Sequence, residues 1–188
     1  NGRAIGQLGT AQVQIGQVKE GLRRLMKAVS LEPQVPELYH NLAAAYRRSG
    51  RLEDAQDAVE RGLRLRPDDP DLVALKSELA WTAGDRDAAW AAIEPFVDSG
   101  VGHPAIAIVM ARLCARRGRA QEGIDALRRL LDEGAIQGTL RMDALFRLGD
   151  LLDNQGAYDE AFEAYTQANA LMRSTHDAAE FSARIDGV

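Results

Sequence analysis

Three features are scarce or missing in this 188-residue sequence, and each gap excludes a class of protein. Cys114 is the single cysteine, so the chain can form neither an internal disulfide nor a multi-cysteine zinc site, and we expect a cytoplasmic location. Charged or amide side chains interrupt every apolar run before it reaches the roughly 18 to 20 residues that a membrane-spanning helix needs. Acidic residues (28) outnumber lysine and arginine (23), which argues against a nucleic-acid partner, because binding a polyanion requires a basic surface.

The sequence also contains no arrangement typical of a catalytic centre. His40, His103 and His176 are far apart and form no His-x-x-x-His pair, so no metal site is indicated. Neither a Gly-x-x-x-x-Gly-Lys-Ser/Thr nor a Gly-x-Gly-x-x-Gly stretch offers a cradle for a nucleotide phosphate. Cys114 has no recognisable base to activate it and is expected to be buried as a small apolar residue. We expect no enzymatic activity, cofactor or metal in this chain.

Glycine, by contrast, recurs at a regular spacing. Gly16, Gly50, Gly84 and Gly118 follow one another at a constant interval of 34 positions, and Gly156 comes four positions later than the same interval predicts. Each of these glycines lies between two amphipathic segments, where a helix must end in a left-handed turn that glycine adopts without strain. The spacing therefore predicts pairs of helices joined at the glycines. The four extra residues of the last interval are expected in a lengthened loop within residues 132–139.

Alignment on these glycines divides the chain into repeats with matching columns. The repeats are residues 2–35, 36–69, 70–103, 104–141 and 142–175, with a capping or linker helix over 176–188. A small residue, where paired helices approach closely, stands five places after each glycine: Gly21, Ala55, Ala89, Gly123 and Ala161. A larger core residue follows four places later: Leu25, Val59, Ile93, Leu127 and Tyr165. The first helices have their own core column, with one misfit: Leu8, Leu42, Lys76, Met110 and Leu148.

The second repeat carries the fullest version of a known pattern. Its residues are Tyr39, Leu42, Ala43, Tyr46, Gly50, Ala55, Val59, Gly62 and Pro67. They resemble the tetratricopeptide repeat, and four further copies extend the resemblance over nearly the whole chain; a generic helical bundle would not predict the constant glycine interval. The resemblance implies an all-α fold, a right-handed α-solenoid of antiparallel helix pairs whose first helices line a concave groove. It also implies a scaffold that binds a protein or peptide in that groove.

The positions that the family directs into the groove can be read from the alignment. In the first repeat they are Gln7, Thr10 and Gln14. We predict partner-binding residues at His40, Asn41, Arg47, Glu78, Trp81, Arg112, Arg116, Arg147, Asp150 and Asn154. The arginines suit an acidic segment, with a solvated face as the alternative, and Trp81 suits either a groove contact or core packing. Asn41 has no lysine beside it, so the carboxylate clamp of some family members is not expected.

The end of the chain has a second resemblance. Residues 149–153, 158–162 and 169–171 look like the last repeat of bacterial proteins that join such an array to a sulfotransferase domain. This resemblance implies an alternative function, as a non-catalytic accessory domain that positions the acceptor of an enzyme beyond Val188. The start at Asn1 fits a piece of a longer protein. A third expectation is self-association, because no helix precedes the one that opens at Gly2 and an apolar end of the array is then exposed.

Overall fold

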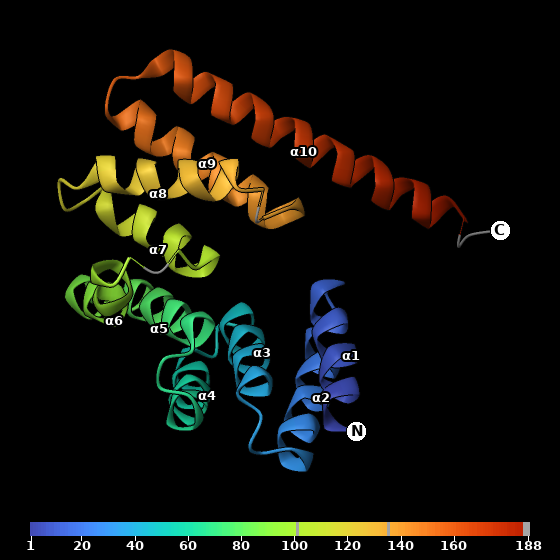
Figure 1. Ribbon diagram of the computed structural model, residues 1–188. Coiled ribbons are helices and arrows are strands. Elements are labelled where there is room, and N and C mark those ends of the chain that lie inside the picture. The colour runs from blue at the N-terminus through green and yellow to red at the C-terminus, as the bar shows by residue number, and fades with distance from the viewer. Residues whose placement is uncertain (101, 135, 186–188) are drawn as a thin grey trace. The chain divides into compact units, whose positions relative to one another are not determined.

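The computed structural model describes the backbone of residues 1–100, 102–134 and 136–185, and within these ranges the side chains as far as residue 172. The described residues form ten α-helices and no β-strand (Figure 1). Consecutive helices pack in pairs, α1 with α2 and so on to α9 with α10. The all-α fold of repeated helix pairs expected from the sequence, an α-solenoid, is confirmed.

The chain forms two compact units, Asn1–Ser99 and Gly100–Val188. The helices of the first unit are α1 (Gly2–Gln14), α2 (Val18–Leu31), α3 (Pro36–Arg48), α4 (Leu52–Leu65), α5 (Pro70–Thr82) and α6 (Arg86–Asp98). Those of the second unit are α7 (Pro104–Cys114), α8 (Ala120–Asp132), α9 (Gly138–Asn154) and α10 (Tyr158–Ile185). The first unit thus contains three helix pairs and the second contains two.

The five repeating glycines form the turns inside the pairs, as predicted. All have positive φ, between 68° and 88°, a conformation that other residues adopt only with strain. Local signals also set the helix starts. Proline opens α3, α5 and α7, where its missing N–H costs nothing, and the Asp69 carboxylate caps α5 by accepting from the Leu72 amide at 3.1 Å.

The four extra residues of the last interval lie in a helix, so the prediction of a lengthened loop is wrong. Helix α9 begins as far beyond Gly118 as α3 begins beyond Gly16, but α9 has 17 residues and α3 has 13. Four residues are close to one helical turn of about 3.6, so the insertion returns the core face of α9 nearly to its original direction. The predicted repeat boundary between residues 141 and 142 falls inside α9.

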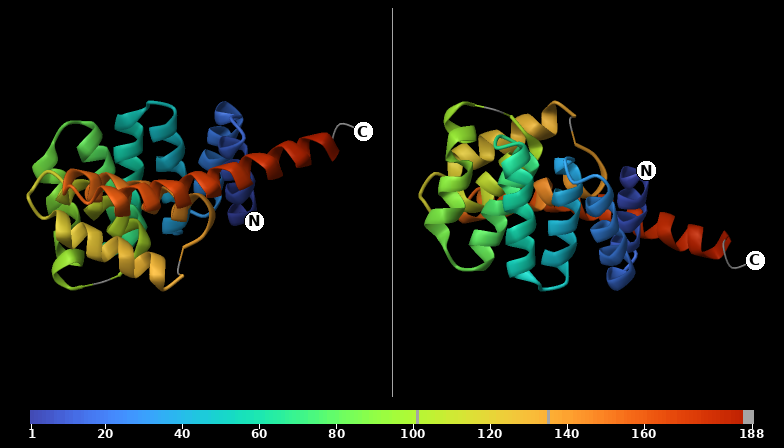
Figure 2. Two further views of the ribbon diagram at one scale, coloured as in Figure 1. Left: turned by 90° about the horizontal axis from the view of Figure 1, so that it is seen from above. Right: turned by 90° about the horizontal axis from the view of Figure 1, so that it is seen from below.

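Helix α10 continues without a break from Tyr158 to Ile185, and Figure 2 shows it as one long helix from two further directions. The boundary predicted at residue 175, with a separate helix over 176–188, therefore matches no helix end. No glycine or proline occurs between Tyr158 and Ile185 to stop the helix. The side chains of residues 173–188 lie outside the described part of the chain.

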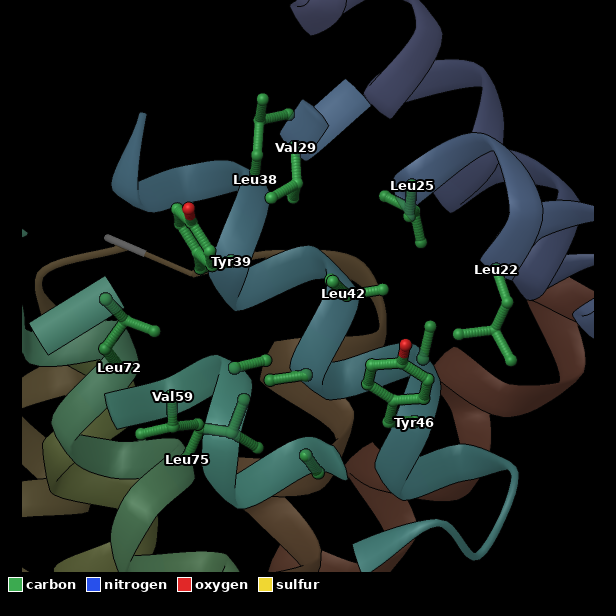
Figure 3. Close-up of a cluster of buried hydrophobic side chains, with 14 of the residues drawn as sticks. Leu22, Leu25, Val29, Leu38, Tyr39, Leu42, Tyr46, Val59, Leu72 and Leu75 are labelled. Atoms are coloured by element: carbon green, nitrogen blue, oxygen red, sulfur yellow. The ribbon is translucent and has the colours of Figure 1, made fainter. Parts of the chain in front are cut away.

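The predicted core columns are largely confirmed in the first unit. Figure 3 shows Leu22, Leu25 and Val29 of α2 on the side that faces α3, opposite Leu38, Leu42 and Tyr46. Each such side chain contributes about 1.5–3 kcal/mol when fully buried. Two residues in the core column of the first helices are not buried. Lys76 is exposed, and Leu8 is 50% exposed because no described helix packs on its side of α1.

Candidate functional site

The first helices of successive pairs form one face within each unit. In the first unit α1 contacts α3 and α3 contacts α5, and in the second unit α7 contacts α9. Among the described helices no comparable backbone contact joins α2 to α4, α4 to α6, or α8 to α10. Within a unit the helices are therefore spaced more closely on the first-helix face, so this face is the inner side of each bend.

A groove of about 550 Å³ opens on this face of the first unit, between α1 and α3. Its apolar lining consists of Val13, Leu25, Ala44 and Ala45. Its polar lining consists of Thr10, Gln14, His40, Asn41, Arg47 and Arg48. The α3 members stand at helical spacings of three, four and seven positions, which places them along one side of the helix. We call these ten residues the groove lining.

Several polar groups of the groove lining are available to a ligand. The side chains of Gln14, His40, Asn41 and Arg48 make no hydrogen bond or ion pair within the described part of the chain. The Thr10 hydroxyl, by contrast, already donates to the Gly6 carbonyl at 3.1 Å. The groove therefore offers two amides, an imidazole and one guanidinium beside an apolar floor.

Arg48 is a groove residue that was not predicted from the sequence. It is exposed on α3 and lines the groove next to Arg47, which was predicted. The repeat register contains the signal, because Arg48 is the counterpart, one repeat later, of Gln14, which the sequence places in the groove. The predicted positions Thr10, Gln14, His40, Asn41 and Arg47 do line the groove together.

Arg47 and Glu78, both predicted as partner-binding residues, pair with each other. The Arg47 Nη1 lies 2.6 Å from the Glu78 Oε2, so the pair joins α3 to α5 across the first-helix face. Such partly exposed pairs contribute about 1 kcal/mol or less. Since the positive charge of Arg47 is already compensated, Arg48 is the stronger attraction for an acidic group.

Trp81 lies near the end of α5 and is half-buried outside the groove lining. The guanidinium carbon of Arg86 stands 4.5 Å from the centroid of the indole ring, a cation–π contact. One face of the ring is therefore covered by a residue of α6. This packing favours the structural interpretation of Trp81 over a groove contact.

Three of the predicted residues of the second unit lie together on α9: Arg147, Asp150 and Asn154. Arg147 lies 3.5 Å from Asp143 and 3.9 Å from Asp150, and Asp150 accepts a 3.0 Å hydrogen bond from the Tyr165 hydroxyl. Asn154 donates to the backbone carbonyl of Asp150 at 2.6 Å. On α7, Arg112 is half-buried, and Arg116 is exposed in the turn after the helix. None of these residues belongs to the groove lining.

A second hollow, of about 370 Å³, lies between α8, α9 and α10. Its apolar lining is Leu131, Leu145, Leu148, Leu152 and Ala164, and its polar lining is Arg128, Asp132, Arg141, Glu160, Glu163 and Gln167. Arg128 forms an ion pair with Glu160 here, and Arg141 donates to the Leu131 carbonyl at 3.0 Å. Both arginines of this hollow are thus already bound to other groups of the chain, whereas Arg48 in the groove is not.

The described residues include no group of three or more His, Cys, Asp or Glu side chains that could hold a metal ion. No helix in that part of the chain combines the length and apolarity needed to cross a membrane.

Cys114 is fully buried at the end of α7, as predicted. Burial, helped by the negative charge of Glu122, raises the pKa of its thiol above the ordinary value to about 11. Because the thiolate is the reactive form, we expect a chromogenic disulfide reagent at pH 8 to react at least about a hundredfold more slowly with the native chain than with the unfolded chain. The native rate should increase as the pH rises towards 11. Equal rates in the native and unfolded chains would contradict the burial of Cys114.

Comparison with known families supports the resemblance to the tetratricopeptide repeat. Three family models, each described as a tetratricopeptide repeat, match residues 12–79, 75–138 and 143–171. Together the three matches cover most of the chain. No curated protein sequence matches it.

Solved structures show the same arrangement of helices at low sequence identity. The APC/C hetero-tetramer Cut9–Hcn1 contains a similar chain, with a TM-score of 0.78 and 16% identity over 91% of this chain, which spans 33% of that chain's length. The structure of Pseudomonas aeruginosa pilF gives a TM-score of 0.69 and 14% identity, covering 89% of this chain and 76% of the other. A MamA fragment from Desulfovibrio magneticus RS-1 gives 0.60 and 18%, covering 92% and 96%. At these identities the similarity establishes the fold alone.

Proposed function

Because the chain is an array of tetratricopeptide repeats, which generally mediate interactions between proteins, we propose that it is a non-catalytic scaffold that binds an extended segment of a partner protein between α1 and α3. The observation that carries this proposal is the groove of about 550 Å³ with four unengaged polar side chains beside an apolar floor. A few well-placed polar groups around an apolar floor are what fix the orientation of a bound ligand.

The groove lining favours a segment that contains an acidic residue. No carboxylate occurs among the ten lining residues, and the exposed guanidinium of Arg48 has no ion-pair partner in the described chain. The amides of Asn41 and Gln14 can both donate to and accept from a peptide backbone. Ala44, the most exposed apolar residue of the groove lining, suits a small apolar side chain next to the acid. We therefore expect peptides with an acidic residue beside an aliphatic one.

A peptide array followed by titration calorimetry tests this proposal. We expect acidic peptides of the stated pattern to bind, and versions with lysine in place of the acid to fail. Arg48→Glu should weaken binding about tenfold or more, since a hydrogen bond to a charged group is worth about 1.5–3 kcal/mol. Asn41→Ala should weaken it about two- to tenfold, since a hydrogen bond between neutral groups contributes about 0.5–1.5 kcal/mol. Arg64→Glu, an equal charge reversal at an exposed position of α4 outside the groove, should leave affinity unchanged. Equal losses from Arg64→Glu and Arg48→Glu would place binding elsewhere.

The accessory role beside a sulfotransferase stays a prediction from the resemblance of residues 149–171, as do the bacterial source and the cytoplasmic location. The resemblance needs a catalytic domain in the same reading frame. Sequencing that frame past Val188 tests it: a phosphosulfate-binding loop after a strand would support the role, and a stop codon close to Val188 would exclude it.

A further inference from the structure

Helix α1 presents an apolar stripe to solvent. Ala4, Leu8 and Ala11 stand at spacings of four and three positions, which places them on one face of the helix, and all three are exposed. Leu8 exposes 50% of its surface. No described helix packs on this face, since α1 contacts only α2 and α3.

The repeat register identifies what kind of surface this stripe is. The counterparts one repeat later, Leu38, Leu42 and Ala45, are buried, and in Figure 3 Leu38 and Leu42 face the apolar side of α2. Leu42, the counterpart of Leu8, is only 6% exposed. In α3 this face therefore receives the second helix of the preceding pair. The same face of α1 is shaped for such a helix.

Helix α10 carries the complementary surface. Tyr158 and Phe162, one turn apart, are exposed, and Phe162 exposes 74% of its surface. Their counterparts in α8, one repeat earlier, are Ala120 and Ile124, which are buried in the core that α8 shares with α9. Ile124 is only 2% exposed. The face of α8 that receives the next first helix is thus present on α10 without a described helix on it.

We propose that a second copy of this chain covers these surfaces, with the α10 face of one copy packed on the α1 stripe of the next. The contact would continue the same kind of interface that already joins α2 to α3 and α8 to α9. The large Phe162 would pack against small alanines and Leu8, as core residues of unequal size interdigitate. Helix α1 contains no acidic residue, so Asp159 and Glu160 of α10 meet no like charge on it.

This contact is heterologous, because it joins two different surfaces, and each added copy brings one new surface of each kind. Assembly is therefore open-ended unless a ring closes. For the wild-type chain we expect the average mass in sedimentation equilibrium to rise with concentration, beyond twice the 20.5 kDa of one copy. Leu8→Glu removes the first surface and Phe162→Glu removes the second, so each variant alone should remain monomeric. Both residues are exposed, so circular dichroism should show both variants folded as the wild type.

Mixing the two variants gives the sharpest outcome. Leu8→Glu keeps an intact α10 face and Phe162→Glu keeps an intact α1 stripe, so an equimolar mixture should form a one-to-one complex that does not extend. Met26→Glu is the matched control, because Met26 is exposed on α2 and its counterparts Glu60 and Glu94 carry the same charge. It should assemble as the wild type does. A wild-type chain that stays monomeric at all concentrations, single variants that still associate, or a mixture that stays monomeric would each overturn the proposal.

Discussion

Replacing Leu25 by alanine is expected to lower the free energy of unfolding of the first unit by about 3 kcal/mol. The Leu25 side chain is fully buried among residues of α1, α2 and α3, and it also forms part of the groove floor. Alanine loses the apolar contacts of the leucine and leaves a cavity between helices that are held by their neighbours. Both tryptophans, Trp81 and Trp90, belong to the first unit, so denaturant unfolding followed by tryptophan fluorescence reports on it.

The neighbouring residue on the same helix provides a matched control. Met26 is half-exposed, so Met26→Ala removes a side chain of similar size that buries much less apolar surface. We expect this control to change stability by about 0.5 kcal/mol or less. If Leu25→Ala and Met26→Ala had similar effects, Leu25 could not lie in the core as described.

Gly21→Ala is expected to destabilise the first unit by about 2 kcal/mol, even though alanine is the better helix former by about 1 kcal/mol. A Cβ atom at Gly21 would lie 2.5 Å from the Val13 Cγ2 and 2.6 Å from the Gly9 carbonyl oxygen. The second contact is with backbone, which cannot move away without separating α1 from α2. Thermal unfolding followed by circular dichroism, together with denaturant titration, measures the loss.

The equivalent residue of the fourth repeat should tolerate the same change. A Cβ atom at Gly123 would lie 3.0 Å from the Leu151 Cδ1, 3.2 Å from the Ala111 Cα and 3.3 Å from the Cys114 Cβ, so each neighbour needs to shift by only a few tenths of an ångström. Gly123→Ala is therefore expected to be close to neutral, with the gain in helix propensity offsetting the crowding. A larger loss from Gly123→Ala than from Gly21→Ala would show that the α1–α2 crossing is looser than described.

The features that depend on local chemistry could be predicted from the sequence. Positive φ at glycine is set within a single residue, so the spacing of Gly16 and its counterparts located every turn inside a helix pair. The small residues five places later, such as Gly21, follow from the same register. This register, together with the resemblance to the tetratricopeptide repeat that it supports, was sufficient for the fold class and for five positions that line the groove.

The features that depend on distant residues could not be predicted. Arg47 and Glu78 belong to different repeats, and nothing local indicates that they form an ion pair. The column alone does not predict that Leu8 is exposed, because the same column position is buried in α3; only the place of α1 at the start of the array indicates it. The glycine spacing gives the length of the insertion but does not show that a helix contains it, so it could not predict the extra turn of α9.

The extra turn of α9 also decides which parts of the chain are interchangeable. Between Gly16, Gly50 and Gly84 every segment has the same length and begins and ends in the same kind of turn, so these segments are natural cassettes for duplication or exchange. Four residues advance a helix by about 400°, which leaves α9 rotated by about 40° and longer by about 6 Å than a standard first helix. A segment exchanged together with α9 would therefore be rotated by the same angle relative to its new neighbours. Chimaeras of the array should be joined at the earlier glycines.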